Sequence, residues 1–530
     1  MSTVSVSDAH PALPIHRHND NGSAESEEPP NSDRDEPPSP SPRHPAWQNV
    51  PNHFWNDWRW QSQNAVRTVD QLTELLSFGD AETDALRQLA ADYKLAIPPY
   101  YFSLIDPKDP NDPIRLQSVA SPLELQSQAG AEEDDPLDED KDSPVRGLTH
   151  RYPDLCLIVT THVCTMYCRF CTRKRATMKR GGWDAISRDD HSMVEYVRQH
   201  PEIHDVIVSG GDPLTLPISK LEFFLESLSA IDHVGVIRLG TRVPVTLPQR
   251  LYDRELIDVI GRSGKVWIQT HFNHPRELTP EASFVCCKLL EAGCPLNNHT
   301  VLLKGVNDSV DTMRELCRGL LRSRVRPYYL FHCDPVTGAG HFRTSVWKGL
   351  EIIEGLRGHI SGLGVPTYVV DAPRGGGKIP LMPNYLVSAS NDAVVLRNYE
   401  GMLVRYDPDG SPVSDQSPRS TQGVSALLAG QQEYLMPEGN VRMARRKAIG
   451  AAQHSATLVD RPEMGAGRTA GAPLLGSTAG PKAKNGPARQ VIRRALGDAH
   501  TAAAAAAILV PAAKRSQAIR RNGPSNKAVV

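Results

Sequence analysis

Three cysteines in the segment CTMYCRFC, at positions 164, 168 and 171, are close enough in sequence to bind one metal centre. Zinc is one alternative, but a structural zinc site normally has four ligands and often pairs them as CxxC. A 4Fe–4S cluster is also usually held by four thiolates. With three, one iron stays open to a small molecule that offers an amine and a carboxylate. These cysteines are therefore candidate ligands of a reactive iron–sulfur cluster.

Two glycine-rich segments are further candidates. In the first, SGGDP (209–213), glycines let the backbone approach a ligand closely, although a plain tight turn explains them as well. The second ends in Lys378 and is not a P-loop, because the spacing is wrong and Ile379 follows the lysine. A lysine on a flexible loop suits a Schiff base that must form and break. An exposed loop lysine is the other interpretation.

Short apolar runs alternate with amphipathic segments from residue 155 onward. This alternation indicates β/α units around a parallel sheet. The expected strands are 155–160, 205–209, 235–240, 265–270, 299–303, 326–331 and 366–370, and the expected helices are 191–199, 219–231, 280–292, 312–321 and 346–356. Six or more units in about 220 residues favour a full or partial (β/α) barrel, whose chemistry lies in the loops after the strands.

The unusual residues follow these strands one after another. The cysteines come after the first strand and the SGGDP segment after the second. His271 and Asn273, in THFNHP, come after the fourth strand and are expected to line the pocket. The remaining six cysteines are scattered, and we expect them to be free and mostly buried in a reducing compartment.

Composition divides the chain into four parts. We expect a disordered acidic and Pro-rich tail over 1–45, an N-terminal helical region over 46–145, the barrel over 146–415, and a basic, Ala/Gly/Pro-rich and largely disordered tail over 416–530. Within the helical region, the spacing from Trp55 to Leu76 predicts helix. A second helix is expected over 81–95, ended by Pro98 and Pro99. The acidic stretch 134–142 is expected to be a surface loop.

Charge argues against nucleic acid and membrane partners. The chain has 530 residues and a formal net charge of −2. Residues 441–530 hold sixteen Lys or Arg against three acidic residues, but they lack aromatic side chains for base stacking, so we expect a solvated tail with a short helix near 502–508. The weakly apolar run 502–510 is too short to span a bilayer, and Asp8 and His10 interrupt any signal peptide, so a cytoplasmic protein is expected.

Residues 54–405 resemble the lysine 2,3-aminomutase family, a group of pyridoxal-phosphate-dependent radical S-adenosylmethionine (SAM) enzymes that move an α-amino group to the β carbon. The cysteine spacing, with an aromatic residue before the second cysteine, is similar to that of the radical SAM superfamily. The matching stretches include WNDWRWQ (55–61), PYYFSLIDPKDPNDPIR (99–115), GLTHRYPD (147–154), CTMYCRFCTRKR (164–175), SGGDPL (209–214), THFNHP (270–275), VLLKGVND (301–308), HFRTS (341–345), EGLRGHISG (354–362), GGGK (375–378), MPNY (382–385) and LRNYEG (396–401). The resemblance implies a radical SAM partial barrel and an isomerase.

The resemblance also implies roles for individual residues. Cys164, Cys168 and Cys171 would bind a 4Fe–4S cluster, Ser209, Gly210, Gly211 and Asp212 would bind SAM, and Lys378 would bind pyridoxal 5′-phosphate as a Schiff base with Arg151 and Tyr152 at its phosphate. Arg173 would pair with the substrate carboxylate, and Asp334 and Asp371 with its terminal cation. Each Asp follows an apolar strand, where a lone carboxylate is costly without a cation.

The chemistry implied by the resemblance begins when the reduced cluster cleaves SAM to a 5′-deoxyadenosyl radical. This radical takes a hydrogen from the substrate β carbon, and the nitrogen migrates with the help of pyridoxal phosphate. L-lysine, giving β-lysine, is the favoured substrate. Arginine, giving β-arginine, is the rival, because two carboxylates accept a guanidinium as readily as an ammonium. An acidic substrate is disfavoured by the Asp pair, and a non-catalytic, metal-stabilised β/α binding protein is the alternative from another class.

Three departures from the family stand out. Cys333 is the last cysteine, so the C-terminal CxCxxC zinc ligands of the lysine enzymes are missing. Leu155 follows RYPD where the family often has a basic residue. Arg374 replaces a glycine and is expected to place an extra cation beside Lys378. The resemblance further implies a flavodoxin- or ferredoxin-like electron donor and a homo-oligomer.

Overall fold

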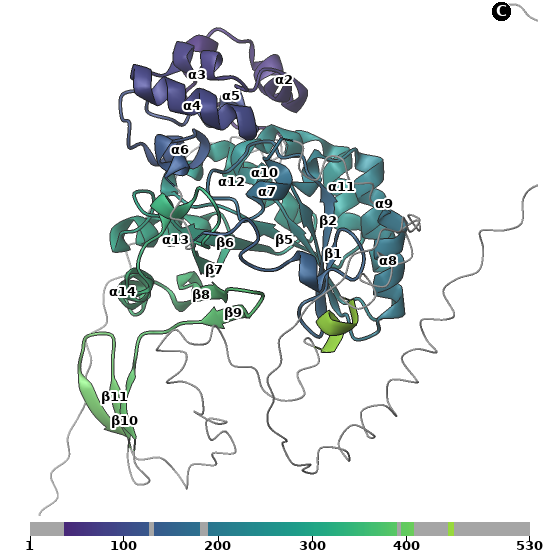
Figure 1. Ribbon diagram of the computed structural model, residues 1–530, viewed down its shortest axis with the longest axis vertical. Helices are drawn as coiled ribbons and strands as arrows, with labels where there is room; N and C mark the ends of the chain where they lie inside the picture. The colour runs from purple at the N-terminus through teal and green to yellow at the C-terminus, as the bar shows by residue number, and fades with distance from the viewer. Residues whose placement is uncertain (1–35, 127–131, 181–188, 390–393, 407–443, 450–530) are drawn as a thin grey trace, which may run out of the picture. The chain divides into compact units, whose positions relative to one another are not determined.

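Seven parallel strands follow one another in chain order across a curved sheet (Figure 1). They are β2 (Leu155–Thr161), β3 (Asp205–Gly210), β4 (Val236–Gly240), β5 (Val266–Thr270), β6 (Leu296–Leu302), β7 (Arg326–His332) and β8 (Thr367–Ala372). All seven expected strands are confirmed. Two antiparallel strands complete the sheet, β1 (Leu148–Thr149) beside β2 and β9 (Gly377–Pro380) beside β8.

The fold is that of a partial barrel. Strand order runs from β1 to β9, and the register of the described strands joins neighbours only, so β1 and β9 are the two edges. We call the space between these edges the seam. The computed structural model describes residues 36–126, 132–180, 189–389, 394–406 and 444–449. These fall within one unit of the chain, residues 1–460, and the second unit, residues 461–530, lies outside the described residues.

Helices cover one face of the sheet (Figure 1). They are α8 (Asp190–Gln199), α9 (Ile218–Ser229), α11 (Arg254–Arg262), α12 (Pro280–Glu291), α13 (Val310–Arg322) and α14 (Val346–Leu356). Five of them confirm expected helices, and α11 was not predicted. Side-chain caps fix several starts, as where Thr279 accepts from the Ala282 amide and Ser309 from the Thr312 amide.

The core lies between these helices and the sheet. Burial alternates along β3 and β4, so that Val206 and Val208 are fully buried with Leu221 and Phe224 of α9. The intervening side chains of these strands are half-buried and point to the barrel interior. This alternation follows from the two-residue repeat of a strand, and it leaves the inner face free for polar groups.

The N-terminal region is helical, but its helices are shorter than expected. The segment 55–76 contains the end of α1 (Asn52–Trp55), α2 (Trp58–Gln63) and α3 (Val69–Leu75), and further helices are α4 (Asp80–Asp92), α5 (Pro99–Phe102) and α6 (Pro113–Ser118). The expectation that prolines end α4 was wrong. The helix ends at Asp92, and Pro99 begins α5, where its missing N–H costs nothing.

Three strands near the C-terminal end of the described chain form a separate antiparallel sheet. They are β10 (Leu386–Ala389), β11 (Val394–Arg397) and β12 (Leu403–Tyr406), and apolar side chains such as Val387 and Leu403 are exposed there. The expected barrel segment 146–415 thus includes a sheet that does not pair with the barrel.

The tails can be compared with expectation only in part. Residues 1–35 and the expected helix near 502–508 lie outside the described residues. Ser41, from the first expected tail, donates two hydrogen bonds to the Glu281 carboxylate of α12. Among the described helices, none combines the length and the apolar character that crossing a membrane requires.

Candidate active site

The three candidate cluster ligands lie in the loop after β2, as predicted. All nine cysteines are free. The three thiols are electrostatic neighbours. Burial, followed by Cys171, Asp212 and Cys168 in that order, raises the pKa of the Cys164 thiol. Burial, followed by Cys168, likewise raises the pKa of the Cys171 thiol. A buried group of soft sulfur ligands that favours the uncharged state is suited to a cluster that supplies compensating positive charge.

The donor set fits an iron–sulfur cluster better than a single ion. Among the described residues, no three His, Cys, Asp or Glu side chains converge on a point that one metal ion could occupy. A cluster does not need such convergence, because each thiolate binds a different iron. Cys164 and Cys171 pack against Ala96, Tyr167 and Met178, and Cys168 packs against the hydrophobic cluster that contains Phe170.

A buried ionic triad holds the cysteine loop. Arg169, within the loop, donates two hydrogen bonds of 2.8 and 2.7 Å to Glu124. Lys174, just after it, donates to the same carboxylate at 2.5 Å. Glu124 belongs to a short 3-10 helix, Pro122–Leu125. The side chains of Arg169 and Lys174 are 2% exposed and that of Glu124 is 0% exposed, so this contact is a fixed support for the loop.

The SGGDP segment packs directly against the chain that leads into the cysteines. Gly210 has φ +131°, and a Cβ there would lie 2.4 Å from the carbonyl oxygen of Thr161. A Cβ on Gly211 would lie 2.4 Å from the Val163 carbonyl oxygen. The absence of side chains at these two glycines therefore lets the backbone of residues 161–163 pack closely against this segment. This packing agrees with the tight-turn interpretation of the segment, and its approach to a ligand stays a prediction.

Asp212 is engaged within the protein. Its carboxylate accepts from the Thr241 hydroxyl and the Arg242 amide, each at 2.7 Å, and from the Leu214 amide at 3.1 Å. This residue therefore ties the loop after β3 to the loop after β4. Ser209 is bound through its carbonyl, which accepts from the Thr160 hydroxyl at 2.9 Å.

Arg173 lies between the thiols and a loop that the sequence did not connect with it. Glu139 accepts two hydrogen bonds from its guanidinium, both 3.1 Å. Burial lowers the pKa of Arg173, but Glu139, Cys171 and Cys164 together raise it above its ordinary value. Arg173 is thus a fixed cation beside the candidate cluster site.

The second half of the site surrounds Lys378 on β9. Its ammonium lies 3.5 Å from Asp371 at the end of β8. It also lies 5.5 Å from the ring centroid of Phe331 and 5.8 Å from that of Tyr152. The Tyr152 hydroxyl accepts from the backbone amide of Lys378 at 2.9 Å. With its side chain 34% exposed, the amine lies near two aromatic rings and remains accessible.

Asp334, in the loop after β7, is the most perturbed carboxyl group of this half. Burial, followed by the neighbouring Asp371, raises its pKa to about 7, while Lys378 and Arg343 act in the opposite direction. Two carboxyl groups thus share one buried space with one lysine. Such a space favours the arrival of another cation.

Arg151 and Tyr152 come from the turn between β1 and β2, across the seam from β9. Arg151 donates from Nε to Asp142 at 2.9 Å and from Nη2 to the Leu137 carbonyl at 2.5 Å. Arg446, from the short helix 444–449, binds both oxygens of the same Asp142 at 2.6 and 3.0 Å. Two guanidinium groups therefore share the Asp142 carboxylate beside the glycine loop, where Arg446 also lies 3.3 Å from the Arg374 carbonyl.

Two histidines fill the barrel interior between the halves. His271 stacks on Phe170 of the cysteine loop at 5.6 Å, and His299 of β6 lies near Lys378, which together with burial lowers the pKa of His299 to about 3. Burial, then Arg242 and then His299, lowers the pKa of His271 well below its ordinary value. The Nε2 atoms of both rings are buried and have no hydrogen-bond partner among the described residues. Neutral, unpartnered polar atoms at both places fit sites that are completed by bound groups.

Asn273 does not line the pocket in the way that was expected. It is fully buried, its amide donates to Gln117 at 3.0 Å, and its side-chain oxygen accepts from the Val301 amide at 2.9 Å. Its task is to hold the loop after β5. The expectation of pocket lining fits His271 and not Asn273.

Electrostatic neighbours connect the two halves. Cys164 and Cys171 act on Arg173, Arg173 is paired with Glu139, and Glu139 and Lys378 both act on Asp334. Glu139 is thus a shared neighbour of Arg173, which follows the cysteine loop, and of Asp334, which lies near Lys378.

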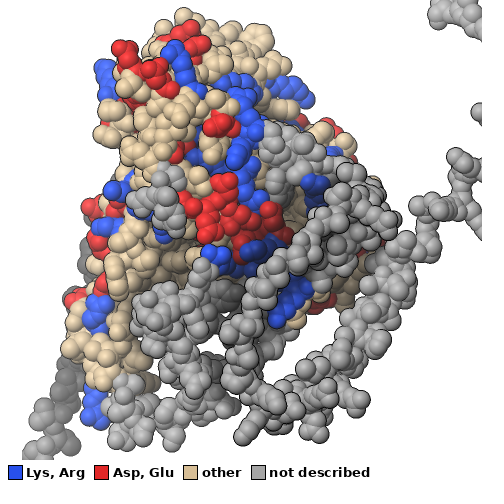
Figure 2. Space-filling model, viewed as in Figure 1, with Lys and Arg blue, Asp and Glu red and all other residues tan. Residues whose placement is uncertain are grey.

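The acidic segment, residues 132–142, supplies many of the carboxylates around the site. Figure 2 shows acidic side chains gathered into a patch with basic groups at its border. Asp135 and Asp140 both pair with Arg175, at 2.8 and 2.9 Å. The expectation of a simple surface loop was wrong for its inner side, because Asp142 is buried and Glu139 is 17% exposed.

Arg374, expected to add a cation beside Lys378, contacts the acidic segment. Its φ of +58° explains why a glycine would suit the position. Its guanidinium lies 3.7 Å from Glu133 of the acidic segment, so its charge is directed to that carboxylate.

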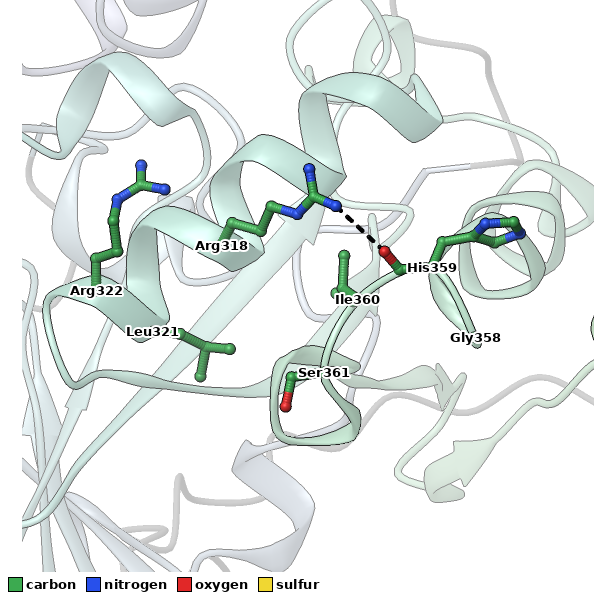
Figure 3. A pocket seen from close by; sticks show the side chains of 7 residues that line it. All are labelled: Arg318, Leu321, Arg322, Gly358, His359, Ile360 and Ser361. Carbon is green, nitrogen blue, oxygen red and sulfur yellow. Dashed lines mark hydrogen bonds between the residues drawn. The ribbon is translucent and has the colours of Figure 1, made fainter. Parts of the chain in front are cut away.

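A hollow of about 550 Å³ lies elsewhere, between α13 and the turn after α14 (Figure 3). Arg318 crosses it to donate to the His359 carbonyl at 3.2 Å. The segments that line it lead into the amino ends of β7 and β8. The cysteine loop and Asp334 follow carboxyl ends, so this hollow is not part of the candidate site.

Sequence reasoning missed four residues of the site, which are Glu139, Arg242, His299 and Arg446. Arg242 and His299 carried a signal, because one follows the carboxyl end of a strand and the other lies on the inner face of a strand. Glu139 and Arg446 carried none, since they reach the site from a loop and from a distant short helix. Contacts of that kind depend on tertiary structure.

Comparison with known proteins gives family matches over both halves. The model of the Radical SAM superfamily matches residues 158–317, and the model described as Lysine-2,3-aminomutase matches residues 353–464. L-lysine 2,3-aminomutase of Clostridium subterminale is 46% identical over 411 residues, which cover 76% of this chain and 98% of that protein. The L-lysine 2,3-aminomutase of Bacillus subtilis (strain 168) is 44% identical over 430 residues, or 79% and 91% of the two chains. Glutamate 2,3-aminomutase of Clostridioides difficile (strain 630) is 44% identical over 355 residues, or 67% and 83%.

Proposed function

Because this chain belongs to the lysine 2,3-aminomutase family of radical SAM enzymes, we propose that it converts L-lysine to β-lysine by moving the α-amino group to the β carbon. The chain is an isomerase, and its family membership implies a 4Fe–4S cluster, SAM and pyridoxal phosphate as cofactors. When bound, these groups supply radical hydrogen abstraction and a conjugated system through which nitrogen can migrate.

The observation that carries the choice of substrate is the pair of carboxyl groups beside Lys378. Asp371 lies 3.5 Å from the lysine amine, and burial with Asp371 nearby raises the pKa of Asp334 to about 7. A substrate with a terminal cation relieves this repulsion, whereas a terminal carboxylate increases it. We therefore do not expect glutamate to be the substrate of this chain, although one of its relatives is a glutamate 2,3-aminomutase.

The chain's own residues fix both ends of such a substrate. Arg173, held by Glu139, offers its remaining N–H groups to the α-carboxylate. Asp334 and Asp371 accept the terminal cation. Holding a flexible substrate at both ends places one C–H bond in reach of the radical, and orientation of this kind is worth several kcal/mol, up to about 7–11 in model reactions.

The residues that would bind the cofactors also lie at the two ends of the site. Cys164, Cys168 and Cys171 would hold the cluster, and the segment from Ser209 to Asp212 would contact SAM. Lys378 would carry pyridoxal phosphate, with Arg151, Tyr152 and the nearby Arg446 at the phosphate.

Arginine is the second candidate substrate. Asp334 follows β7 and Asp371 lies near the end of the neighbouring strand β8, where Phe331 of β7 pairs in register with Val369 of β8. Two carboxylates side by side suit the two edges of a guanidinium as well as one ammonium.

The test is anaerobic incubation of the reconstituted protein with reductant, SAM, pyridoxal phosphate and equal amounts of lysine, arginine and glutamate. Products are identified by mass and retention time. We expect β-lysine, while β-arginine as the main product would support the second candidate and β-glutamate would refute the role of the Asp pair.

Two variants sharpen this test. Asp371→Asn is expected to lose at least tenfold in turnover of the cationic substrate while the absorbance of the cluster and of the lysine-bound cofactor is unchanged. Asp311→Asn is the matched control, because Asp311 is 91% exposed on α13. Equal kinetics of Asp371→Asn and the parent enzyme would refute the assignment of Asp371.

A further inference from the structure

Arg242 reaches one of the three candidate cluster ligands. It follows β4 and precedes the short helix α10 (Val243–Thr246). Its Nη1 atom lies 2.8 Å from the sulfur of Cys168. The side chain is 9% exposed, so this contact is shielded from water.

The guanidinium is held in place by acceptors other than the sulfur. Its Nη2 donates to Gln117 and to Glu277, each at 2.7 Å, and its Nε donates to the His271 carbonyl at 3.1 Å. These acceptors come from α6, from a 3-10 helix (Pro275–Glu277) and from the loop after β5. The direction of Nη1 toward the sulfur is therefore set by three independent parts of the fold.

The counterion of Arg242 is itself fully engaged. Glu277 accepts from the Tyr101 hydroxyl at 2.6 Å and from the amides of Asn273 and His274 at 2.6 and 3.0 Å. Tyr101 also lies within 3.3 Å of Nη2. A network with every member satisfied is rigid, so the N–H donor cannot easily turn away from Cys168.

We propose that Arg242 raises the reduction potential of the cluster by donating a hydrogen bond to the Cys168 thiolate. This inference rests on the proposed function, because it requires the cluster to be present. One electron from a low-potential donor protein converts the oxidised cluster to its reduced form, and no bond to Arg242 forms or breaks. The added electron increases the negative charge on the cluster sulfurs, and an N–H donor stabilises that charge.

Burial makes the effect larger than it would be at the surface. The same hydrogen bond in water competes with solvent donors, whereas here the local dielectric constant is low and the donor is charged. Cys171, in contrast, contacts uncharged groups, which are the backbone of Arg173 and, weakly, the Thr177 hydroxyl at 4.0 Å. Arg242 is thus a positioning residue that influences the reduction potential of the cluster through one of its three ligands, Cys168.

Arg242 also connects this ligand with the loop after β3. Its backbone amide donates to Asp212 at 2.7 Å, while its side chain binds Cys168. A substitution of the side chain leaves that backbone contact in place. The experiment can therefore separate the potential of the cluster from the arrangement of the SGGDP segment.

The test uses Arg242→Gln and Arg242→Lys in the full-length, anaerobically reconstituted protein. The midpoint potential is measured by electron paramagnetic resonance during a dithionite titration, with iron and sulfide analysis to confirm full cluster content. For Arg242→Gln we expect the ratio of reduced to oxidised cluster at a fixed potential to fall at least tenfold, which corresponds to a shift of 59 mV to lower potential. Arg242→Lys keeps the charge and is expected to give a smaller shift in the same direction.

Arg250→Gln is the matched control. Arg250 is also a buried arginine, but it binds the Leu214 carbonyl and Asp253. We expect its midpoint potential to equal that of the parent. An equal shift in this control would overturn the inference, because it would show that loss of any buried arginine has the same effect.

A measurement on the parent protein covers the case in which Arg242→Gln fails to fold. The iron–sulfur stretching frequencies in the Raman spectrum are expected to shift when water is exchanged for D2O, because an N–H donor on a ligand sulfur exchanges. Unshifted frequencies would overturn the inference. A fully loaded cluster with unchanged potential in both Arg242 variants would also overturn it and leave the proposed function intact, whereas a protein that binds no iron and sulfide would overturn both.

Discussion

Glu139 holds Arg173 by one edge of its guanidinium, with hydrogen bonds of 3.1 Å from both Nε and Nη2. A guanidinium has five N–H groups in a planar fork, so Nη1 and one proton of Nη2 remain for another acceptor. The acidic segment therefore orients the cation that we propose for the substrate carboxylate. Glu139 acts through Arg173 and is a positioning residue.

Replacement of Glu139 by Gln is expected to raise KM for the amino acid more than it lowers kcat. A hydrogen bond to a charged group contributes about 1.5–3 kcal/mol, so kcat/KM is expected to fall roughly tenfold to a hundredfold. Asp140→Asn is the control, because Asp140 makes a similar two-fold contact with Arg175 but is 58% exposed. A loss of the same size in the control would show that the segment acts only as a scaffold.

The pH dependence of kcat/KM is expected to show an ascending limb near pH 7. Burial, followed by Asp371, raises the pKa of Asp334 to about 7 in the free enzyme. A cationic substrate needs the ionised form, so kcat/KM increases as pH rises through this value and then levels off. Asp334→Asn removes the limb and lowers the plateau. A limb that persists unchanged in this variant would assign the titration to another group.

The same perturbation affects stability in the opposite sense. The folded protein binds the Asp334 proton more tightly than the unfolded chain, whose carboxyl group titrates near 3.8. The free energy of unfolding contributed by this group therefore decreases as pH rises from about 4 to about 7. The cofactor-free Asp334→Asn variant is expected to lose this slope in urea unfolding, and an unchanged slope would contradict the raised pKa.

Gly210→Ala is expected to destabilise the protein by at least about 2 kcal/mol, from strain at a positive φ and from the overlap with the Thr161 carbonyl. Gly264→Ala separates these causes, because Gly264 has φ +66° and no atom within 4 Å of an added Cβ. Its cost is expected to be about 1 kcal/mol. Urea unfolding measures both, and iron content is expected to fall only for Gly210→Ala. Equal costs would show that the close backbone approach is unimportant.

Glu124→Gln is expected to destabilise the cysteine loop by about 3–5 kcal/mol, because it leaves Arg169 and Lys174 buried without their counterion. Burial favours the protonated carboxyl group, yet Arg169 and Lys174 lower the pKa of Glu124 to about 2. The stabilisation is thus complete above about pH 4.5 and is lost as pH falls toward 2. Glu195→Gln, which removes an exposed contact with Arg198, is expected to leave the free energy of unfolding nearly unchanged. Equal losses in the two variants would contradict the role of burial.

The apolar pattern of the sequence was sufficient to predict the barrel strands, because each strand is a short apolar run that can be recognised locally. All seven parallel strands were predicted within a few residues, although β6 begins at Leu296, before the apolar run at 299–303, since polar Asn297 and Asn298 hide its start. The N-terminal helices were predicted less well. Their ends depend on contacts such as that of the Gln61 side chain with the Tyr100 amide, which the local pattern does not contain.

The candidate site was predictable where residue type and strand position coincide. Cys164 and Asp334 follow strands, and Asp371 is the next-to-last residue of β8. Glu139 could not be found in this way. Its role depends on a loop folding back 34 residues along the chain to Arg173, and a run of acidic residues does not show which of them turns inward.

The location of the lysine at the seam has a consequence for the empty protein. Lys378 belongs to one edge strand, and Tyr152, whose hydroxyl it contacts, belongs to the turn beside the other. A group bound between them would connect the two edges of the sheet, at β1 and β9. Pyridoxal phosphate would then stabilise the fold in addition to its chemical role. The melting temperature of the protein would rise with the concentration of pyridoxal phosphate even when no amino acid is present.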